Sequence, residues 1–206
     1  MVRKQIALVG GRLCLDFVNT VSWRGTEEPY DNLSTYADLV RWSERAGALL
    51  RDQARATRRS ASRHPPKATA VLARARELRD AMYRILLAWK KGRPPRAADI
   101  ALLNASAPAR AELGWTRGRL TWAIQGTSRL DEMLWPIVWS AADLVAEGQA
   151  RRLKSCGSDA CGWLFYDESR SGRRRWCSMS DCGNRAKAKR FYARATGSSR
   201  KVSSAR

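Results

Sequence analysis

The 206-residue chain has a single histidine, only five cysteines and no long apolar run. A helix that crosses a bilayer needs about 20 apolar residues, whereas the apolar stretch at 133–146 is interrupted by Pro136 and Asp143. The first residues, Met-Val-Arg-Lys-Gln, do not open the apolar run of about seven residues that a signal peptide needs. We therefore expect a cytoplasmic protein with no membrane contact, whose thiols stay reduced.

Groups that commonly carry catalysis are also scarce. His64 lies in a polar stretch ahead of Pro65 and Pro66, where we expect a solvated loop residue. Cys14 lies in an apolar segment and is expected to be a buried small hydrophobe. There is no nucleophile motif and no phosphate loop. The sequence thus predicts that the protein is not an enzyme and has no catalytic residue.

The other four cysteines lie in the last quarter of the chain, as Cys156-x4-Cys161-x15-Cys177-x4-Cys182. Two close pairs separated by a short span favour a closed four-thiolate site for one structural zinc ion. Two disulfides would suit a secreted domain instead, and the Cys-x2-Cys runs of iron–sulfur proteins are missing. Zinc is the interpretation that fits best.

Positive charge is concentrated around these cysteines. The whole chain has a formal charge of +20. Residues 1–150 carry 24 Lys/Arg against 15 Asp/Glu, whereas residues 151–206 carry 15 against 4. Arginine outnumbers lysine 31 to 8, a bias that genome composition can produce, but such a bias does not explain the asymmetry. A basic, metal-folded module points first to nucleic acid.

The first 149 residues predict a mainly helical domain for sensing or dimerisation. The pair Thr35 and Asp38 fits a capping box. Pro136 falls inside a predicted helix and is expected to kink it, and Gly148 suits a helix C-terminus. The expected elements are a strand or hairpin leading into a short helix over 6–21, helices near 34–50, 68–91, 97–106 and 128–147, a frayed helix end or mobile loop over 51–67, and a hairpin over 113–123.

Residues 150–195 predict a small treble-clef-like finger, and 196–206 a disordered basic tail. Short strands over 151–154 and 163–166 flank the first cysteine pair, and a helix over 178–195 starts at the second pair. The fold class is therefore α+β, mainly α. A module of about 50 residues buries too little apolar surface to fold alone, so we expect chelation to unfold 151–195 and leave 1–150 intact.

The predicted C-terminal helix has two faces. Lys187, Arg190 and Arg194 form a basic stripe on one of them. Ala188, Phe191, Tyr192 and Ala195 form an apolar stripe that is expected to cover the zinc hairpin. Asn184 and Arg185 suit base-edge contacts, or equally the anchoring of the helix start and the thiolates. The candidate DNA-binding residues are Arg173, Arg174, Arg175, Asn184, Arg185, Lys187, Lys189, Arg190 and Arg194.

Four polar and aromatic residues cluster at the end of the first apolar segment. Asp16, Asn19, Thr20 and Trp23 are candidates for a small-molecule pocket. A polar network that caps a strand-to-helix turn is the alternative, and the sequence favours it.

Several segments resemble a known family. The first cysteine pair followed by Trp-Leu-Phe-Tyr-Asp, and the run Arg-Arg-Trp-Cys-Ser-Met-Ser-Asp-Cys-Gly-Asn-Arg, are similar to the CGNR zinc finger. The segment Gly-Gly-Arg-Leu-Cys-Leu-Asp-Phe-Val-Asn-Thr resembles the start of the domain of putative stress-induced transcription regulators of bacteria that commonly precedes that finger. The resemblance implies zinc on all four cysteines and DNA binding.

The predicted function is therefore a zinc-dependent, DNA-binding transcription regulator of the bacterial nucleoid. Its N-terminal domain would sense a small-molecule effector or mediate homodimerisation. Two alternatives stay open. One is an RNA-binding or ribosome-associated zinc protein, with bases stacked on Trp163, Phe165, Tyr166 and Trp176. The other is a zinc-stabilised protein-interaction module.

Overall fold

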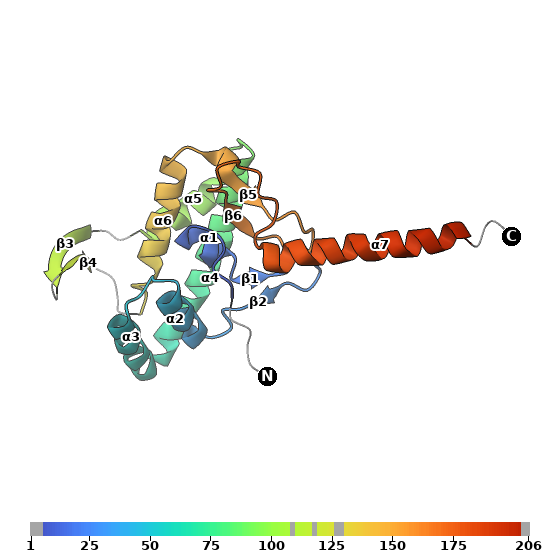
Figure 1. Ribbon diagram of the computed structural model, residues 1–206. Helices are drawn as coiled ribbons and strands as arrows, with labels where there is room; N and C mark the ends of the chain where they lie inside the picture. Colours follow the sequence, from blue (N-terminus) through green and yellow to red (C-terminus); the bar gives the residue numbers. More distant parts are fainter. Residues whose placement is uncertain (1–5, 108–109, 117–118, 126–129, 203–206) are drawn as a thin grey trace.

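A computed structural model describes residues 6–107, 110–116, 119–125 and 130–202, with the backbone alone described over 110–116, 119–125 and 195–202. The helices are α1 (Leu13–Val18), α2 (Tyr36–Arg45), α3 (Arg51–Arg63), α4 (Pro65–Lys90), α5 (Ala97–Ala105), α6 (Leu134–Ala146) and α7 (Asn184–Val202) (Figure 1). The strands form three antiparallel pairs: β1 (Val21–Ser22) with β2 (Tyr30–Asp31), β3 (Arg110–Thr116) with β4 (Arg119–Gln125), and β5 (Leu153–Ser155) with β6 (Leu164–Tyr166). The chain is mainly helical with small β-hairpins, as the sequence predicts.

The short helix α1 lies at the centre of the core. Cys14, Leu15, Phe17 and Val18 are completely buried, between the apolar faces of α4, α6 and β6. Phe17 also contacts Trp42 of α2, with the ring centroids 5.4 Å apart. Only a short, almost wholly apolar helix can be enclosed on so many sides. The strand expected over 6–9 does not form.

Local signals place most helix ends. Thr35 and Asp38 form the predicted capping box at the start of α2. Gly47, at φ +78°, follows the end of this helix, so the chain leaves it earlier than the predicted range. Gly148, at φ +67°, follows α6 as expected.

Two expectations about the helices were wrong. Residues 51–63 form a regular helix, α3, rather than a frayed end or loop, and its buried Ala54 and Thr57 hold it on the core. Pro136 lies in the first turn of α6, because that helix starts at Leu134 after a turn over 130–133. The missing N–H of proline costs nothing in a first turn, so no kink follows.

The finger shares the main core with the helical domain. The side chains of β6 alternate between the two faces of the strand. Leu164 and Tyr166 are buried with Leu153 in the core around α1, whereas Phe165 is buried among the four cysteines. The hairpin β5–β6 is therefore the boundary layer between the two clusters.

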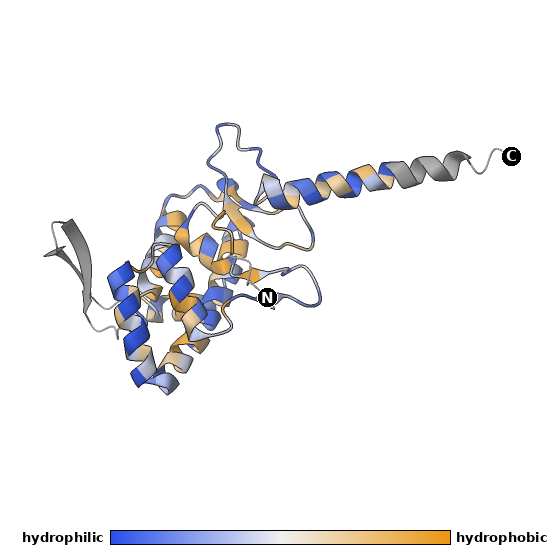
Figure 2. Ribbon diagram, turned by 60° about the horizontal axis from the view of Figure 1, so that its bottom comes forward, coloured by the Kyte–Doolittle hydropathy of each residue, from blue (hydrophilic) through white to orange (hydrophobic). Residues whose placement is uncertain are grey.

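Helix α7 projects from the body as a single rod, in both views (Figures 1 and 2). The apolar stripe predicted to cover the zinc hairpin does not do so, since Phe191 and Tyr192 are 69% and 68% exposed. The helix runs to Val202, so the tail expected to be disordered from 196 is helical over most of its length. The segment Thr196-Gly-Ser-Ser that opens this extension is made of poor helix formers, so intrinsic propensity predicts no helix there. None of the described helices combines the length and apolar character that a membrane crossing requires.

Candidate metal centre and its surroundings

The four predicted zinc ligands converge on one buried point. Cys156 and Cys161 flank the knuckle between β5 and β6, while Cys177 and Cys182 lie on the segment that leads into α7. All four side chains are at most 8% exposed. Their sulfur atoms lie within 4.8 Å of one another.

The spacing of the sulfur atoms fits zinc. A tetrahedral site with Zn–S bonds of about 2.3 Å places neighbouring sulfurs about 3.8 Å apart. The Sγ atoms of Cys161 and Cys177 are 3.8 Å apart, and those of Cys177 and Cys182 are 3.6 Å apart. The donor set is soft, closed and four in number, which is the composition of a structural zinc site.

The protonation of the thiols also favours a cation. Hydrogen bonds from Cys161 and Cys177 lower the pKa of the Cys156 thiol to about 2. The same hydrogen bonds raise the pKa of Cys161 to about 12 and raise the pKa of Cys177 as well. Four negative sulfurs cannot share this space alone, so zinc uptake must displace protons from the cluster. These four residues would hold the zinc ion, which would act as a structural staple with no open position for substrate.

The tetrapeptide Cys182–Arg185 builds the turn that carries the last ligand. Cys182 lies in a π-helical turn, Met179–Gly183. Gly183 fits this turn because a Cβ atom there would lie 2.5 Å from the sulfur of Met179. The side-chain amide of Asn184 donates to the carbonyl of Ser180 at 3.2 Å. Asn184 thus stabilises the same turn from the side.

Arg185 reaches back to the thiolate of Cys182. Its Nη2 lies 3.4 Å from that Sγ atom and 3.1 Å from a carboxylate oxygen of Asp181. Burial acts to lower the pKa of Arg185, but the hydrogen bond to Cys182 and the charge of Asp181 raise it. The guanidinium also stacks on the ring of Trp23, 4.4 Å from its centroid. These contacts place Arg185 in the anchoring role, one of the two roles that the sequence left open.

Arg174 is a second arginine that contacts the segment of the cysteine cluster. Its guanidinium donates to the carbonyls of Trp176, Cys177 and Val9, and it stacks 4.4 Å from the centroid of Phe165. Its backbone N–H donates to the buried carboxylate of Asp167. The sequence placed Arg174 among DNA-binding residues, whereas these contacts engage its side chain with the finger and with Val9 of the N-terminal domain.

The helical domain grips the first cysteine pair. Tyr83 donates from its hydroxyl to the carbonyl of Gly162 at 2.9 Å. Gly25 donates to the carbonyl of Ala160, and a Cβ atom on Gly25 would lie 1.7 Å from the carbonyl oxygen of Asp159. The indole of Trp163 donates to the carbonyl of Val21 at 2.8 Å. The knuckle therefore makes direct hydrogen bonds with the helical domain, in addition to its covalent connection through the chain.

The candidate pocket residues serve contacts within the protein. Asn19 is completely buried, and its amide pairs with both the N–H and the carbonyl of Leu164, at 2.9 and 2.8 Å. Asp16 accepts from the N–H of Gly10, and the hydroxyl of Thr20 donates to the carbonyl of Phe17. Trp23, at φ +59°, holds Arg185. These contacts form an internal polar network that extends to the finger, but no strand precedes α1, so the strand-to-helix turn that the sequence predicted is absent from the described residues.

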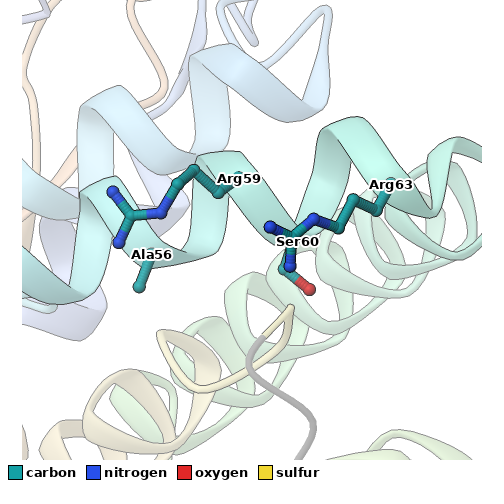
Figure 3. Close-up of a pocket in the computed structure, with 4 residues that line it drawn as sticks. All are labelled: Ala56, Arg59, Ser60 and Arg63. Atoms are coloured by element: carbon teal, nitrogen blue, oxygen red, sulfur yellow. The ribbon is translucent and has the colours of Figure 1, made fainter.

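Two hollows on the described surface lie away from the four candidate pocket residues. One, of about 260 Å³, lies along α3 and is lined by Ala56, Arg59, Ser60 and Arg63 (Figure 3). The other, of about 280 Å³, is lined by Arg151, Arg152, Lys154, Arg170, Ser171 and Gly172. None of the four candidate pocket residues lines either hollow. The sequence analysis did not predict a site at the second hollow, although its arginines and lysine belong to the basic C-terminal segment.

The remaining predicted residues have simple surroundings. Arg173, Lys187, Lys189, Arg190 and Arg194 are exposed, four of them on α7. Arg175 is exposed, with its guanidinium 5.6 Å from the ring centroid of Trp176. Phe165 and Tyr166 are buried core residues, so these two aromatic rings are not available to stack on bases.

Cys14 and His64 occupy the environments that the sequence predicted. Cys14 is completely buried, and burial raises the pKa of its thiol to about 12. His64 is exposed at the junction of α3 and α4.

Comparison with protein families identifies two successive regions. Residues 11–148 match the ABATE family, described as a putative stress-induced transcription regulator. Residues 152–195 match the CGNR zinc finger. No curated protein matches the chain.

Proposed function

We propose, from the premise that this chain belongs to the ABATE family of putative stress-induced transcription regulators and ends in a CGNR zinc finger, that it binds duplex DNA through α7 and regulates transcription. The observation that carries the proposal is the projection of α7 from a zinc-anchored base, with its cations exposed. Lys187, Arg190 and Arg194 recur at i, i+3 and i+7, on one side of the helix. An isolated basic helix of this kind has the dimensions of the major groove.

In this proposal the helical domain fixes the finger in place. The zinc ion holds the start of α7, and Arg185 and Trp23 link that start to the loop between β1 and β2. A change in the helical domain, whether from an effector or from dimerisation, would therefore reach the base of α7 through this loop. No catalytic role is proposed for any residue, and location at the nucleoid follows from the proposal.

The test is the salt dependence of DNA binding. Replacing Lys187, Arg190 and Arg194 together with alanine should lower the slope of log K against log salt by about 3, since each phosphate contact contributes about 0.9. Fluorescence anisotropy of a labelled duplex over a series of salt concentrations measures this slope. The triple change avoids compensation between neighbouring cations.

The matched control replaces Arg55, Arg59 and Arg63, which are exposed on α3, with alanine. It removes the same charge and preserves helix propensity. An equal loss of affinity in both triple variants would show that net charge alone drives binding, and would reject α7 as the DNA-binding element. So would unchanged binding in the α7 variant.

One observation favours a second candidate, a protein-interaction module. Phe191 and Tyr192 form an edge-to-face pair, 5.8 Å between centroids, on the exposed part of α7. Exposed aromatic pairs are enriched at protein interfaces. Capture of protein partners that is lost in a Phe191→Ser/Tyr192→Ser variant, with no nucleic acid recovered, would favour this reading over DNA binding.

A further inference from the structure

The hollow beside β5 has an unusual lining. Arg151, Arg152, Lys154 and Arg170 contribute four cations, and Ser171 and Gly172 complete the wall. Its volume of about 280 Å³ is at the lower end for small-molecule sites, which are mostly lined by apolar groups. This lining is instead suited to a compact anion.

The nearest carboxylates in the sequence neutralise these cations only in part, through the electrostatic interaction of Lys154 with Asp167. Asp167 is completely buried and accepts hydrogen bonds from Ser169 and from the N–H of Arg174. Glu168 pairs with Arg12. In the part of the chain that the structure describes, no salt bridge joins a carboxylate to any of the four cations of the hollow. Positive charge at this place therefore exceeds the negative charge around it.

Part of the lining is held in position. The guanidinium of Arg152 donates from Nε to the side chain of Gln149 at 2.8 Å and from Nη1 to the carbonyl of Asp167 at 2.9 Å. Asp167 fixes the turn that carries Ser171, and Gly172, at φ +61°, leaves open space where a side chain would otherwise lie. A fixed guanidinium loses little entropy when it binds an anion.

We propose that this hollow binds a phosphate group. Arginine forks match the oxygen geometry of phosphate, and lysine adds a point charge. The phosphate can belong to the DNA backbone, in which case the site extends the proposed DNA-binding surface from α7 onto the finger hairpin, or to a small phosphorylated molecule. The site itself does not depend on the proposed function.

The test variant is Arg151→Gln/Arg170→Gln. Both side chains are exposed, so the fold should persist, which zinc content and circular dichroism verify. The control variant is Arg55→Gln/Arg93→Gln, which removes the same charge at exposed positions outside the hollow. Two probes separate the two sources: pyrophosphate, followed by titration calorimetry at low salt, and a short duplex, followed by anisotropy over a salt series.

We expect the hollow variant to bind pyrophosphate roughly tenfold more weakly than the control, if a small phosphate is the ligand, because two charge-assisted contacts are lost. We expect its DNA salt slope to fall by about 2, if backbone phosphates occupy the site. Either result supports the proposal. If the parent binds pyrophosphate at the hollow but binds no duplex, the DNA function fails and the phosphate site stands. If neither probe separates the hollow variant from the control, the proposal is overturned.

Discussion

Arg185 shows how a single side chain can serve a metal site without ligating the metal. Its contact with the Cys182 sulfur stabilises the charged thiolate, and its stack on Trp23 fixes the direction of the guanidinium. Partners of this kind hold ligands in the geometry that the metal requires. The left-handed backbone of Trp23 is consistent with a residue held in place by this stack.

Replacing Arg185 with methionine should therefore weaken zinc binding. The expected loss of affinity is about tenfold or more, the size seen when such supporting partners are removed. Competition with a chromogenic chelator measures it. Arg190→Met is the control, because Arg190 lies exposed on the same helix, away from the sulfurs. Equal affinities in the two variants would mean that Arg185 does not stabilise the thiolate.

At the scale of elements, one ion pair fixes the β1–β2 ribbon to α4. Arg79 is 3% exposed and donates to both carboxylate oxygens of Asp31, at 2.7 and 2.9 Å. Burial acts to raise the pKa of Asp31, but the hydrogen bonds and charge of Arg79 outweigh it and hold that pKa below its ordinary value of 3.8. The ribbon carries the loop that grips the zinc knuckle, so this pair supports the site from a distance.

The sign of the pH effect follows from the lowered pKa. The stabilisation is present above the unfolded-state pKa of about 3.9 and is lost as pH falls through the lower folded-state pKa. Asp31→Asn removes the bidentate partner of the buried Arg79 and leaves it only Asp80, at 3.3 Å, so the free energy of unfolding at pH 7 should fall by up to about 3 kcal/mol. The gap between parent and variant should narrow below pH 3.8.

Urea unfolding of the parent and the variant over a range of pH measures this difference in stability. An excess of chelator is present throughout, so that loss of zinc in acid does not add to the pH dependence. Asp143→Asn is the control, at an exposed position, and should change stability by no more than about 0.5 kcal/mol. A gap between parent and Asp31→Asn that stays constant from pH 7 to below pH 3.8 would contradict the linkage.

Sequence patterns predicted the features that depend on a few neighbouring residues, but not those that depend on contacts between distant parts of the chain. The four cysteines and the Thr35 box were predictable, because ligand chemistry and capping act over a few residues. The exposure of the α7 stripe was not predictable, since an apolar face on Phe191 and Tyr192 does not say whether a surface exists to cover it. The pairing of Asn19 with Leu164 joins residues 145 apart in the sequence, and only the folded chain brings them together.

At the scale of the whole molecule, the finger and the helical domain share one core. Leu153, Leu164 and Tyr166 belong to the finger by sequence and to the α1 cluster by packing. Loss of the hairpin would therefore uncover α1 as well as the cysteines. The sequence alone predicted that residues 1–150 stay intact when chelation unfolds the finger, because it contains no information on which cluster each strand face would join.

Chelation should consequently destabilise more than the finger. Without zinc, repulsion and protonation of the thiols loosen the knuckle, and β6 loses the cluster that holds Phe165. Because Leu164 and Tyr166 pack on α1, we expect its amides, Leu13–Val18, to exchange faster with solvent hydrogen when a strong chelator is added. Hydrogen exchange read by mass spectrometry measures this, with α3, which packs on α2 and α4, as the internal reference. If α1 keeps full protection while 151–195 exchanges freely, the helical domain is stable by itself and the shared core does not couple the two. If α1 and the hairpin lose protection together, zinc stabilises the domain that carries the finger as well as the finger itself.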